Sequence, residues 1–385
     1  MGLKVALCAC LPFPTSQGSQ VLTHAVAQSL ARLGHEVHLV TYAYGESRVD
    51  MEYRHHTAGS WIPARKLRAG PSVWKPLLDA AVAKKWLEVA RASEADILHA
   101  INYEAALVGL WVRRRHRAPL VVSLHGMLDE ELPFYFAGAF AKRLARRFGR
   151  WFMERIVPRA DLVLTLNPRD AARLEEFGVS RDAARWHYPA VELAGELPRA
   201  DEARRVLGWQ GRRVILYAGN LDDYQGLDAL AFAFREIADR RDDVILSVVT
   251  TSDPAPFLRR LAGLRERVVV LLTADFEVIK RAIAACDAFV VARPVSYGFP
   301  MKLLNALAVG APVVIHRSCA YGVEHGREVW IYDGSWRSLV EALEKVLFDD
   351  DISSRLREGA RSASERFDLL AMGGAIQGFY ESLLA

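Results

Sequence analysis

Residues 3–42 read LKVALCACLPFPTSQGSQVLTHAVAQSLARLGHEVHLVTY, and this stretch decides the fold. Leu3–Ala9 is a nearly continuous apolar run, which is typical of a strand buried on both faces of a parallel sheet. A loop rich in Pro and Gly follows, and the apolar spacing then predicts a helix over 19–33. Val37–Tyr42 is the next predicted strand. A strand, a helix and a strand in this order indicate a parallel, doubly wound α/β sheet.

The same order of elements repeats along the chain, with a lapse of the apolar pattern near 193–211. Further strands are predicted at Ile97–Ala100, Leu120–Leu124, Leu162–Leu166, Val214–Ala218, Val244–Val249, Val268–Leu272, Ala288–Ala292 and Pro312–Ile315. Later helices are predicted at Gly226–Ala238, Ser335–Leu347, Ile352–Glu365 and Leu369–Leu384. We therefore expect two Rossmann-like doubly wound domains that face a central cleft, over residues 1–195 and 196–366. A C-terminal helix in 367–385 is expected to pack back on the N-terminal domain.

The composition narrows the class of protein. Of the 385 residues, 51% are hydrophobic and 25% are charged, which is the balance of a folded globular protein and excludes disorder. The net charge of +4 is too small to predict a nucleic-acid partner. The four cysteines form no CxxC pair, so we expect reduced thiols in the cytoplasm and no metal site. No apolar run approaches the roughly 18 residues of a membrane span.

The N-terminal half holds two candidate sites. Gly18 would let the backbone approach a ligand, and Ser19 is the expected N-cap of a helix whose free N–H groups could face an anion. A plain strand-to-helix turn is the alternative. His125 follows a predicted strand and precedes Gly126, so its imidazole is expected at the sheet edge, near a substrate hydroxyl. A structural role is the alternative. One carboxylate of Asp129–Glu131 could reach the cleft, or the run is a solvated helix start.

The C-terminal half holds two more candidate sites. In LYAGNLDDYQGLD (216–228), Gly219 precedes a polar loop whose Asn220 and Gln225 could touch phosphate oxygens; a capped Asx-rich loop is the alternative. In RPVSYGFPMKLLNALAVGAPVV (293–314), a loop leads into a helix with Pro300 near its first turn, where bare N–H groups favour an anion. A lysine there opposes the helix dipole, so Lys302 indicates an anionic ligand unless it is solvated. Arg293 and Lys302 together could neutralise a diphosphate, and Asn305 could bond a sugar hydroxyl.

Together these segments resemble glycosyltransferase family 4, whose fold is GT-B. The resemblance includes LARLGHEVHLVT after the first loop, HG at 125–126, ADLVLTLNPRDAARLEEFGV at 160–179, LYAGNLDDYQGLDAL at 216–230 and GFPMKLLNALAVGAPVV at 298–314. It implies a retaining, metal-independent hexosyltransferase with no cofactor. Its substrate would be a nucleotide sugar, UDP before GDP, held mainly by the second domain. The acceptor, a saccharide or lipid-linked molecule of the cell envelope or of an exopolysaccharide, would lie on the first domain.

The resemblance also assigns roles to single residues. His125 and Lys302 are expected to be catalytic. Asn220 and Gln225 stand where the family often has Arg and Lys, and Tyr297 and Asn305 stand where it has two Glu residues. The expected donor-binding residues are Gly18, Ser19, Gly219, Asn220, Gln225, Arg293, Tyr297, Gly298, Phe299, Pro300 and Asn305. Because both Glu residues are absent, a catalytically silent nucleotide-sugar-binding protein is one alternative. A sugar-nucleotide 2-epimerase of the same fold is the other, but such enzymes use paired carboxylates, of which this chain has no obvious pair.

One further stretch, FYFAGAFAKRLARRFGRWFMERIV (134–157), predicts an amphipathic helix. Phe136, Phe140, Leu144, Phe148 and Phe152 are spaced by four, with basic residues largely off that stripe. Such a helix can lie on an anionic membrane surface, which would attach the protein to the inner face of the membrane. A helix whose aromatic side packs into the core is the alternative.

Overall fold

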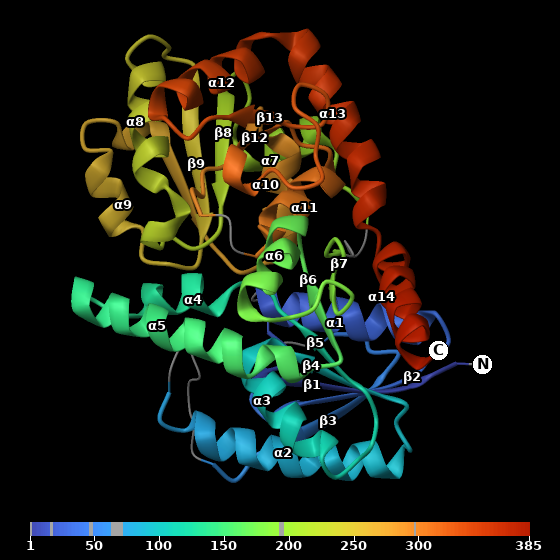
Figure 1. Cartoon of the computed structure of the whole chain (residues 1–385). Helices are drawn as coiled ribbons and strands as arrows, with labels where there is room; N and C mark the ends of the chain where they lie inside the picture. The colour runs from blue at the N-terminus through green and yellow to red at the C-terminus, as the bar shows by residue number, and fades with distance from the viewer. Residues whose placement is uncertain (1, 16–17, 46–48, 63–71, 192–195, 296–297) are drawn as a thin grey trace. The chain divides into compact units, whose positions relative to one another are not determined.

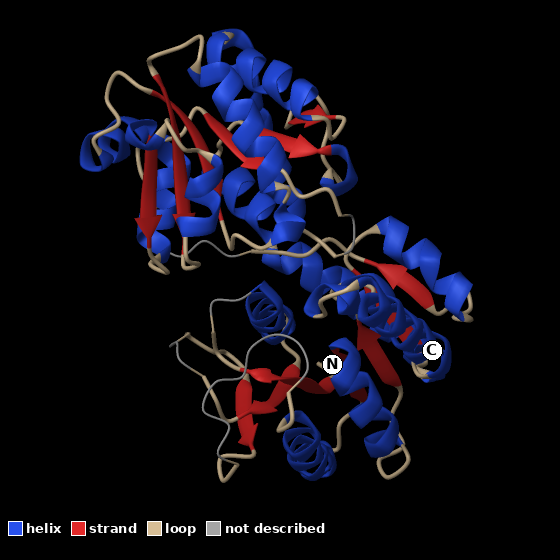
Figure 2. Cartoon of the chain, turned by 90° about the vertical axis from the view of Figure 1, so that its left-hand side faces the viewer, coloured by secondary structure: helices blue, strands red, loops and turns tan. Residues whose placement is uncertain are grey.

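The computed structural model describes residues 2–15, 18–45, 49–62, 72–191, 196–295 and 298–385. The chain forms two compact units. The first comprises Met1–Glu192, Tyr297–Phe299 and Asp368–Ala385, and the second comprises Leu193–Ser296 and Pro300–Phe367. Each unit is an α/β layer structure in which helices flank one parallel sheet (Figures 1 and 2).

The first unit contains a seven-stranded sheet in the order β3-β2-β1-β4-β5-β6-β7. In that order, the strands are Arg54–Ala58, Glu36–Tyr42, Lys4–Pro12, Ile97–Ile101, Leu120–Ser123, Leu162–Thr165 and Ala184–Trp186. The helices are α1 (Gly18–Arg32), α2 (Lys75–Ala92), α3 (Asn102–Arg113), α4 (Leu128–Glu131), α5 (Ala139–Arg155), α6 (Pro168–Arg173) and α14 (Leu369–Leu384). β1 is buried because it pairs with β2 on one side and with β4 on the other.

The second unit contains a six-stranded sheet in the order β10-β9-β8-β11-β12-β13. In that order, the strands are Val268–Leu272, Val244–Thr250, Arg213–Ala218, Ala288–Val291, Val313–His316 and Trp330–Tyr332. The helices are α7 (Ala200–Leu207), α8 (Leu227–Ala238), α9 (Ala255–Arg260), α10 (Phe276–Ala285), α11 (Met301–Val309), α12 (Trp336–Phe348) and α13 (Asp350–Ser364). All the strand pairs in both sheets are parallel, which confirms the predicted doubly wound class.

The last helix returns to the first unit. Asp368 caps α14 by accepting from the N–H groups of Leu370 and Ala371. The helix packs against α1 (Figure 1), and its close approach at Gly373 leaves no room for a Cβ beside Ser29. Tyr380 is fully buried, and its hydroxyl lies 2.6 Å from Nδ1 of His99 on β4. α14 is therefore part of the core of the first unit.

Three strands were not predicted from the sequence. β3, β7 and β13 are edge strands of five, three and three residues. An edge strand packs on one neighbour only and needs few apolar residues, so RHHTA in β3 shows no strand pattern. Among the helices of the described residues, none is long and apolar enough to cross a membrane.

Candidate active site

In the second unit, a cluster of polar side chains surrounds Lys302 at the carboxyl edge of the sheet. Lys302 is the second residue of α11, and its Nζ donates to Tyr217 Oη (3.0 Å) and to Gln225 Oε1 (2.9 Å). Gln225 Nε2 donates in turn to Asn220 Oδ1 (2.7 Å), and Tyr217 Oη donates to the Asn220 carbonyl (2.5 Å). The structure therefore brings together three residues predicted from two separate motifs, Lys302 from one and Asn220 and Gln225 from the other. Tyr217, at the end of β8, was missed.

The Lys302 ammonium is bonded to neutral groups in this cluster, and its Nζ also lies 4.3 Å from the centroid of the Tyr217 ring. Its two hydrogen-bond acceptors, Tyr217 and Gln225, are both neutral. Burial, followed by repulsion from the Arg293 guanidinium, lowers the pKa of Lys302 to about 7. The Arg293 Cζ lies 5.7 Å from the Tyr224 ring centroid. A bound anion would reverse this shift by favouring the charged ammonium, so the cluster is suited to a phosphate group.

Two glycines are required by the geometry of this cluster. A Cβ on Gly219, whose φ is +143°, would lie 2.8 Å from Lys302 Nζ. Gly226 precedes α8 with φ +70°, and a Cβ there would lie 2.2 Å from the Ala292 carbonyl oxygen. The backbone of the loop 219–226 is therefore pressed against the end of β11.

We expect Gly226→Ala to lower the free energy of unfolding by at least about 2 kcal/mol, because a left-handed conformation alone costs about 1–2 kcal/mol in a residue with a Cβ. The clash with Ala292 is with backbone and cannot be relieved by a rotamer change. Urea unfolding followed by circular dichroism measures the loss. Gly263→Ala is the matched control, since that glycine also has a positive φ (+89°) but no atom near its Cβ position. Equal losses in the two variants would contradict the close contact.

In the first unit, His125 follows β5 and is held by Asn102, the first residue of α3. Asn102 Oδ1 accepts from the backbone N–H of His125 (3.0 Å), which leaves its Nδ2 facing His125 Nδ1 at 3.4 Å. An amide nitrogen can only donate, so Nδ1 is the acceptor and the ring proton lies on Nε2. Asn102 adopts φ +68°, which suits asparagine.

The Nε2 atom of His125 is buried and has no hydrogen-bond partner among the described residues. Burial, followed by the nearby His187, lowers the pKa of His125 to about 3, so the ring is neutral. His187 Nδ1 donates to the Tyr188 carbonyl (2.9 Å), which leaves its buried Nε2 as an acceptor, also without a partner in the described ranges. One ring thus offers a donor and the other an acceptor, which are the two roles that a sugar hydroxyl complements.

His99 supports this region from β4. Its Nε2 lies 2.6 Å from Ser123 Oγ and its Nδ1 lies 2.6 Å from Tyr380 Oη. Burial lowers the pKa of His99 to about 3. Because both of its ring nitrogens are paired within the protein, His99 has a structural role.

Gly298 belongs to the first unit, and both of its backbone polar groups are hydrogen-bonded within that unit. Its N–H donates to Asp170 Oδ2 (3.2 Å), and its carbonyl accepts from Asn167 Nδ2 (3.3 Å). A Cβ on Gly298 would lie 2.4 Å from the His125 carbonyl oxygen. The Asp170 carboxylate therefore occupies the Gly298 N–H, and a donor-binding role for Gly298 stays a prediction.

The other predicted site residues lie as follows. Gly18 is exposed and begins α1. Ser19 therefore lies inside the first turn, and the prediction that it is the N-cap was wrong. Phe299 and Pro300 are buried, and Pro300 is the N-cap of α11, with Asn305 half-buried one turn along. Tyr297 lies outside the described residues. His125 belongs to the first unit and Lys302 to the second.

The carboxylates of Asp129–Glu131, which follow His125, are engaged in ion pairs and hydrogen bonds within the first unit. Asp129 accepts from Arg173 (2.9 Å), Glu130 from Arg169 (2.7 Å), and Glu131 from the hydroxyls of Tyr103 and Tyr135. These carboxylates therefore fasten α4 to α6 and α3, and the run is not simply a solvated helix start. Within the described ranges, no group of three His, Cys, Asp or Glu side chains could hold a metal ion.

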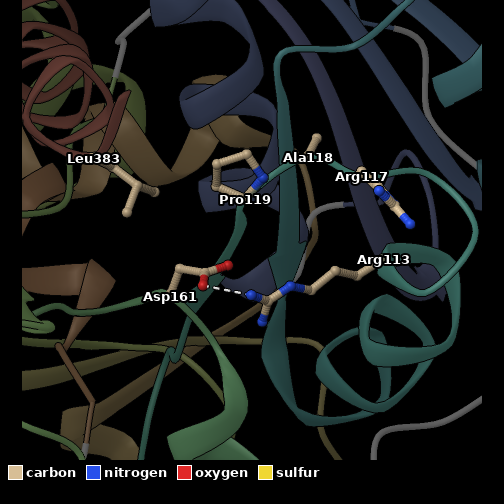
Figure 3. A pocket seen from close by; sticks show the side chains of 6 residues that line it. All are labelled: Arg113, Arg117, Ala118, Pro119, Asp161 and Leu383. Atoms are coloured by element: carbon tan, nitrogen blue, oxygen red, sulfur yellow. Dashed lines mark hydrogen bonds and ion pairs between the residues drawn. The ribbon is translucent and has the colours of Figure 1, made fainter. Parts of the chain in front are cut away.

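A cavity of about 400 Å³ lies at the opposite edge of the first sheet (Figure 3). Its lining residues are Arg113, Arg117, Ala118, Pro119, Asp161 and Leu383. Arg113 pairs with Asp161 (2.6 Å), whose other oxygen accepts from the Leu120 N–H. Ligands of parallel sheets bind at the carboxyl ends of the strands, whereas the segment 113–119 precedes β5 and Asp161 precedes β6. The charged groups here stabilise the sheet and offer no reactive pair.

Comparison with known proteins identifies the family. Residues 16–194 match the family model described as "Glycosyltransferase Family 4", and residues 212–349 match "Glycosyl transferases group 1". A D-inositol 3-phosphate glycosyltransferase of Corynebacterium diphtheriae is 25% identical over 94% of this chain and 89% of that protein. A phosphatidyl-myo-inositol mannosyltransferase of Mycobacterium leprae is 24% identical over 78% of this chain and 76% of that protein.

Solved structures share the architecture. Sucrose-phosphate synthase from Thermosynechococcus elongatus superposes with a TM-score of 0.79 at 18% identity, over 99% of both chains. HepE from Anabaena in complex with UDP-glucose superposes with a TM-score of 0.72 at 19% identity, over 99% of this chain and 100% of that chain. These likenesses confirm the predicted GT-B fold. With both halves matched by their family models, the chain belongs to the group 1 glycosyltransferases of family 4.

Proposed function

We propose that the protein is a retaining hexosyltransferase that moves a sugar from a nucleotide-diphosphate sugar to a saccharide or lipid-linked acceptor. The Lys302 cluster is the observation that carries this proposal. It places the Lys302 Nζ between two neutral hydrogen-bond acceptors, and burial followed by repulsion from Arg293 lowers the pKa of Lys302 to about 7. The proposed setting is cell-envelope or exopolysaccharide synthesis at the inner face of the membrane. The four free, buried cysteines fit a reducing compartment.

In the proposed reaction, the bond between the anomeric carbon of the sugar and the diphosphate oxygen breaks, and a bond from that carbon to an acceptor hydroxyl oxygen forms. Negative charge develops on the leaving phosphate oxygen, which takes up the proton of the acceptor hydroxyl. Lys302 would meet that charge, with Arg293 as a second cation. Fixed charges aimed at a leaving group are worth most when they need no reorganisation, and Lys302 is held in place by Tyr217 and Gln225. On the first unit, the Nε2–H of His125 would donate to an oxygen of the sugar or acceptor.

Gln225, which stands where the family often has Lys, fits this arrangement. A Lys at position 225 would place a second ammonium where Gln225 Oε1 now accepts from Lys302 at 2.9 Å. Gln225 instead orients Lys302 through its Oε1, while its Nε2–H donates a hydrogen bond to Asn220 Oδ1. We infer that Lys302 carries more of the phosphate charge here than in relatives with a Lys at that position.

The names of similar proteins favour particular substrates. The relatives named above act on inositol 3-phosphate or phosphatidyl-myo-inositol, which are polyol phosphates, and the HepE complex contains UDP-glucose. We therefore propose a UDP-sugar as the first donor to test and a GDP-sugar as the second. No metal ion or cofactor is part of the proposed mechanism.

Donor binding is expected to weaken as the pH rises through about 7. Below that pH, Lys302 is already protonated in the free enzyme, whereas above it the neutral amine must take up a proton before it can pair with the diphosphate as an ammonium. Calorimetric titration with UDP-glucose and GDP-mannose between pH 6 and 9 measures the slope. The Lys302→Met variant is the control, because it cannot titrate. A wild-type slope equal to that of the variant would contradict the assignment.

The product establishes the reaction type. The anomeric configuration of the transferred sugar, read by NMR, is expected to equal that of the donor. Activity is expected to persist in a metal chelator. Consumption of donor without any acceptor would favour a sugar-nucleotide 2-epimerase, and donor binding with no turnover over a broad acceptor panel would favour a silent binding protein.

A further inference from the structure

Helix α5 presents a surface that the proposed reaction does not use. Of its 17 residues, only Ala145, Gly149, Phe152 and Met153 are buried. Gly149 lies against the α4 backbone, where a Cβ would be 2.7 Å from the Leu128 carbonyl oxygen. This close crossing fixes the rotation of α5 about its axis and therefore decides which side chains face outward.

One outward face of α5 is aromatic. Phe140 is 82% exposed, Leu144 61%, Phe148 53% and Trp151 50%, whereas Phe152 is only 7% exposed. At about 100° per residue, the four exposed side chains fall within about 80° of one another. Of the predicted stripe, Phe140, Leu144 and Phe148 are therefore exposed on α5, whereas Phe152 is buried against Tyr103 and Phe136 precedes the helix, which begins at Ala139. A contiguous exposed apolar stripe of this kind indicates a binding surface.

A basic face lies beside the aromatic one. Arg143, Arg146, Arg147 and Arg150 are exposed and fall within about 100° of one another on the same helical projection. The helix carries six basic residues and one acidic residue, Glu154, which pairs with Arg150 at 2.7 Å. The surface therefore combines uncovered aromatic rings with a row of positive charge along the length of the helix.

We propose that α5 docks on an anionic lipid bilayer, lying in the plane of the interface. This inference rests on the proposed function, because a lipid-linked acceptor is reached at such a surface. Phe140, Leu144, Phe148 and Trp151 enter the boundary between headgroups and acyl chains, and the neighbouring arginines contact lipid phosphates. Charge complementarity selects this partner: a row of cations along a helix matches a continuous layer of phosphates.

Vesicle flotation of the full chain tests the proposal. Vesicles of two parts phosphatidylcholine to one part phosphatidylglycerol should carry the protein upward at low salt, and pure phosphatidylcholine should carry much less. Arg143→Gln with Arg147→Gln should weaken binding about 30-fold, at about 1 kcal/mol for each cation near the surface. Phe140→Gln with Trp151→Gln should weaken it by at least about 100-fold, from the apolar area that no longer enters the bilayer.

Matched controls come from the second unit. Arg205→Gln with Arg259→Gln removes the same charge, and Val206→Gln with Leu272→Gln removes two exposed apolar side chains. Both control variants should float like the wild type. The proposal is overturned if the wild type binds neither vesicle, or if the α5 variants bind as it does. It is also overturned if sedimentation shows a dimer that Phe140→Gln with Trp151→Gln dissociates, since the face would then bind a second copy.

Donor binding separates this inference from the proposed function. Titration with UDP-glucose and GDP-mannose without vesicles should give the same affinities for the α5 variants and the wild type. Failed flotation with intact donor binding removes the membrane surface and leaves the sugar transfer standing. Flotation without donor binding would do the reverse.

Discussion

Replacing Lys302 by Ala is expected to lower sugar transfer by about 10²–10³-fold, which is the usual effect of removing one preorganised group that stabilises developing charge. The Lys302 Nζ is held by Tyr217 Oη and Gln225 Oε1, and neither can take over its charge. Lys302→Arg should not restore the rate, because a planar guanidinium does not take the place of the compact ammonium between Tyr217 Oη and Gln225 Oε1. Steady-state turnover with the best donor measures both variants.

The control for this prediction is Lys345→Ala, which removes the same side chain from an exposed position on α12. Its turnover should equal that of the wild type. Thermal unfolding of all the variants checks that the fold is retained. Wild-type turnover in Lys302→Ala, with the fold intact, would show that the leaving group is stabilised elsewhere.

Asn102→Asp is expected to lower transfer by about 10–100-fold through the tautomer of His125. A carboxylate at 102 could still accept from the His125 backbone N–H, but its second oxygen would require a proton on Nδ1. Nε2 would then lose the hydrogen that it offers to the substrate. A buried donor and acceptor left unmatched cost about 1–3 kcal/mol, which sets the size of the loss. Initial rates at saturating donor measure it.

Asn102→Gly is the companion variant, since glycine accepts the positive φ of this position and leaves the ring free to keep its proton on Nε2. It should retain more activity than Asn102→Asp. Nitrogen NMR of the His125 ring reports the tautomer directly. A proton on Nε2 in both variants, or a lower rate for the glycine variant, would contradict the positioning role of Asn102.

Most of the fold could be predicted from the sequence, because buried parallel strands are short apolar runs between amphipathic helices. Val268–Leu272 has the predicted bounds, and β1, β4 and β8 differ by one to three residues at an end. β3 and β7 could not be predicted, since an edge strand exposes most of its side chains and is stabilised by one partner. Each forms by hydrogen bonding to a neighbouring strand, β3 to β2 and β7 to β6, which the local sequence does not reveal.

The candidate site was predictable only in part. Asn220, Gln225 and Lys302 follow strands β8 and β11, and parallel strands bring such loops to one edge. Tyr217 was hidden within an apolar strand, and Asn102 and His187 act through tertiary contacts that no local pattern encodes. For α5, the spacing predicted an aromatic stripe. Only the crossing at Gly149 shows that Trp151 faces outward and Phe152 inward.

The return of α14 to the first unit has a consequence for biosynthesis. A ribosome must translate the whole second unit before the partner of His99, Tyr380, leaves the exit tunnel. Until then, the part of α1 around Ser29 lacks the helix that packs on it, and Nδ1 of His99 lacks its hydrogen-bond partner. The nascent first unit therefore stays incompletely packed until the second unit and then α14 have been synthesised.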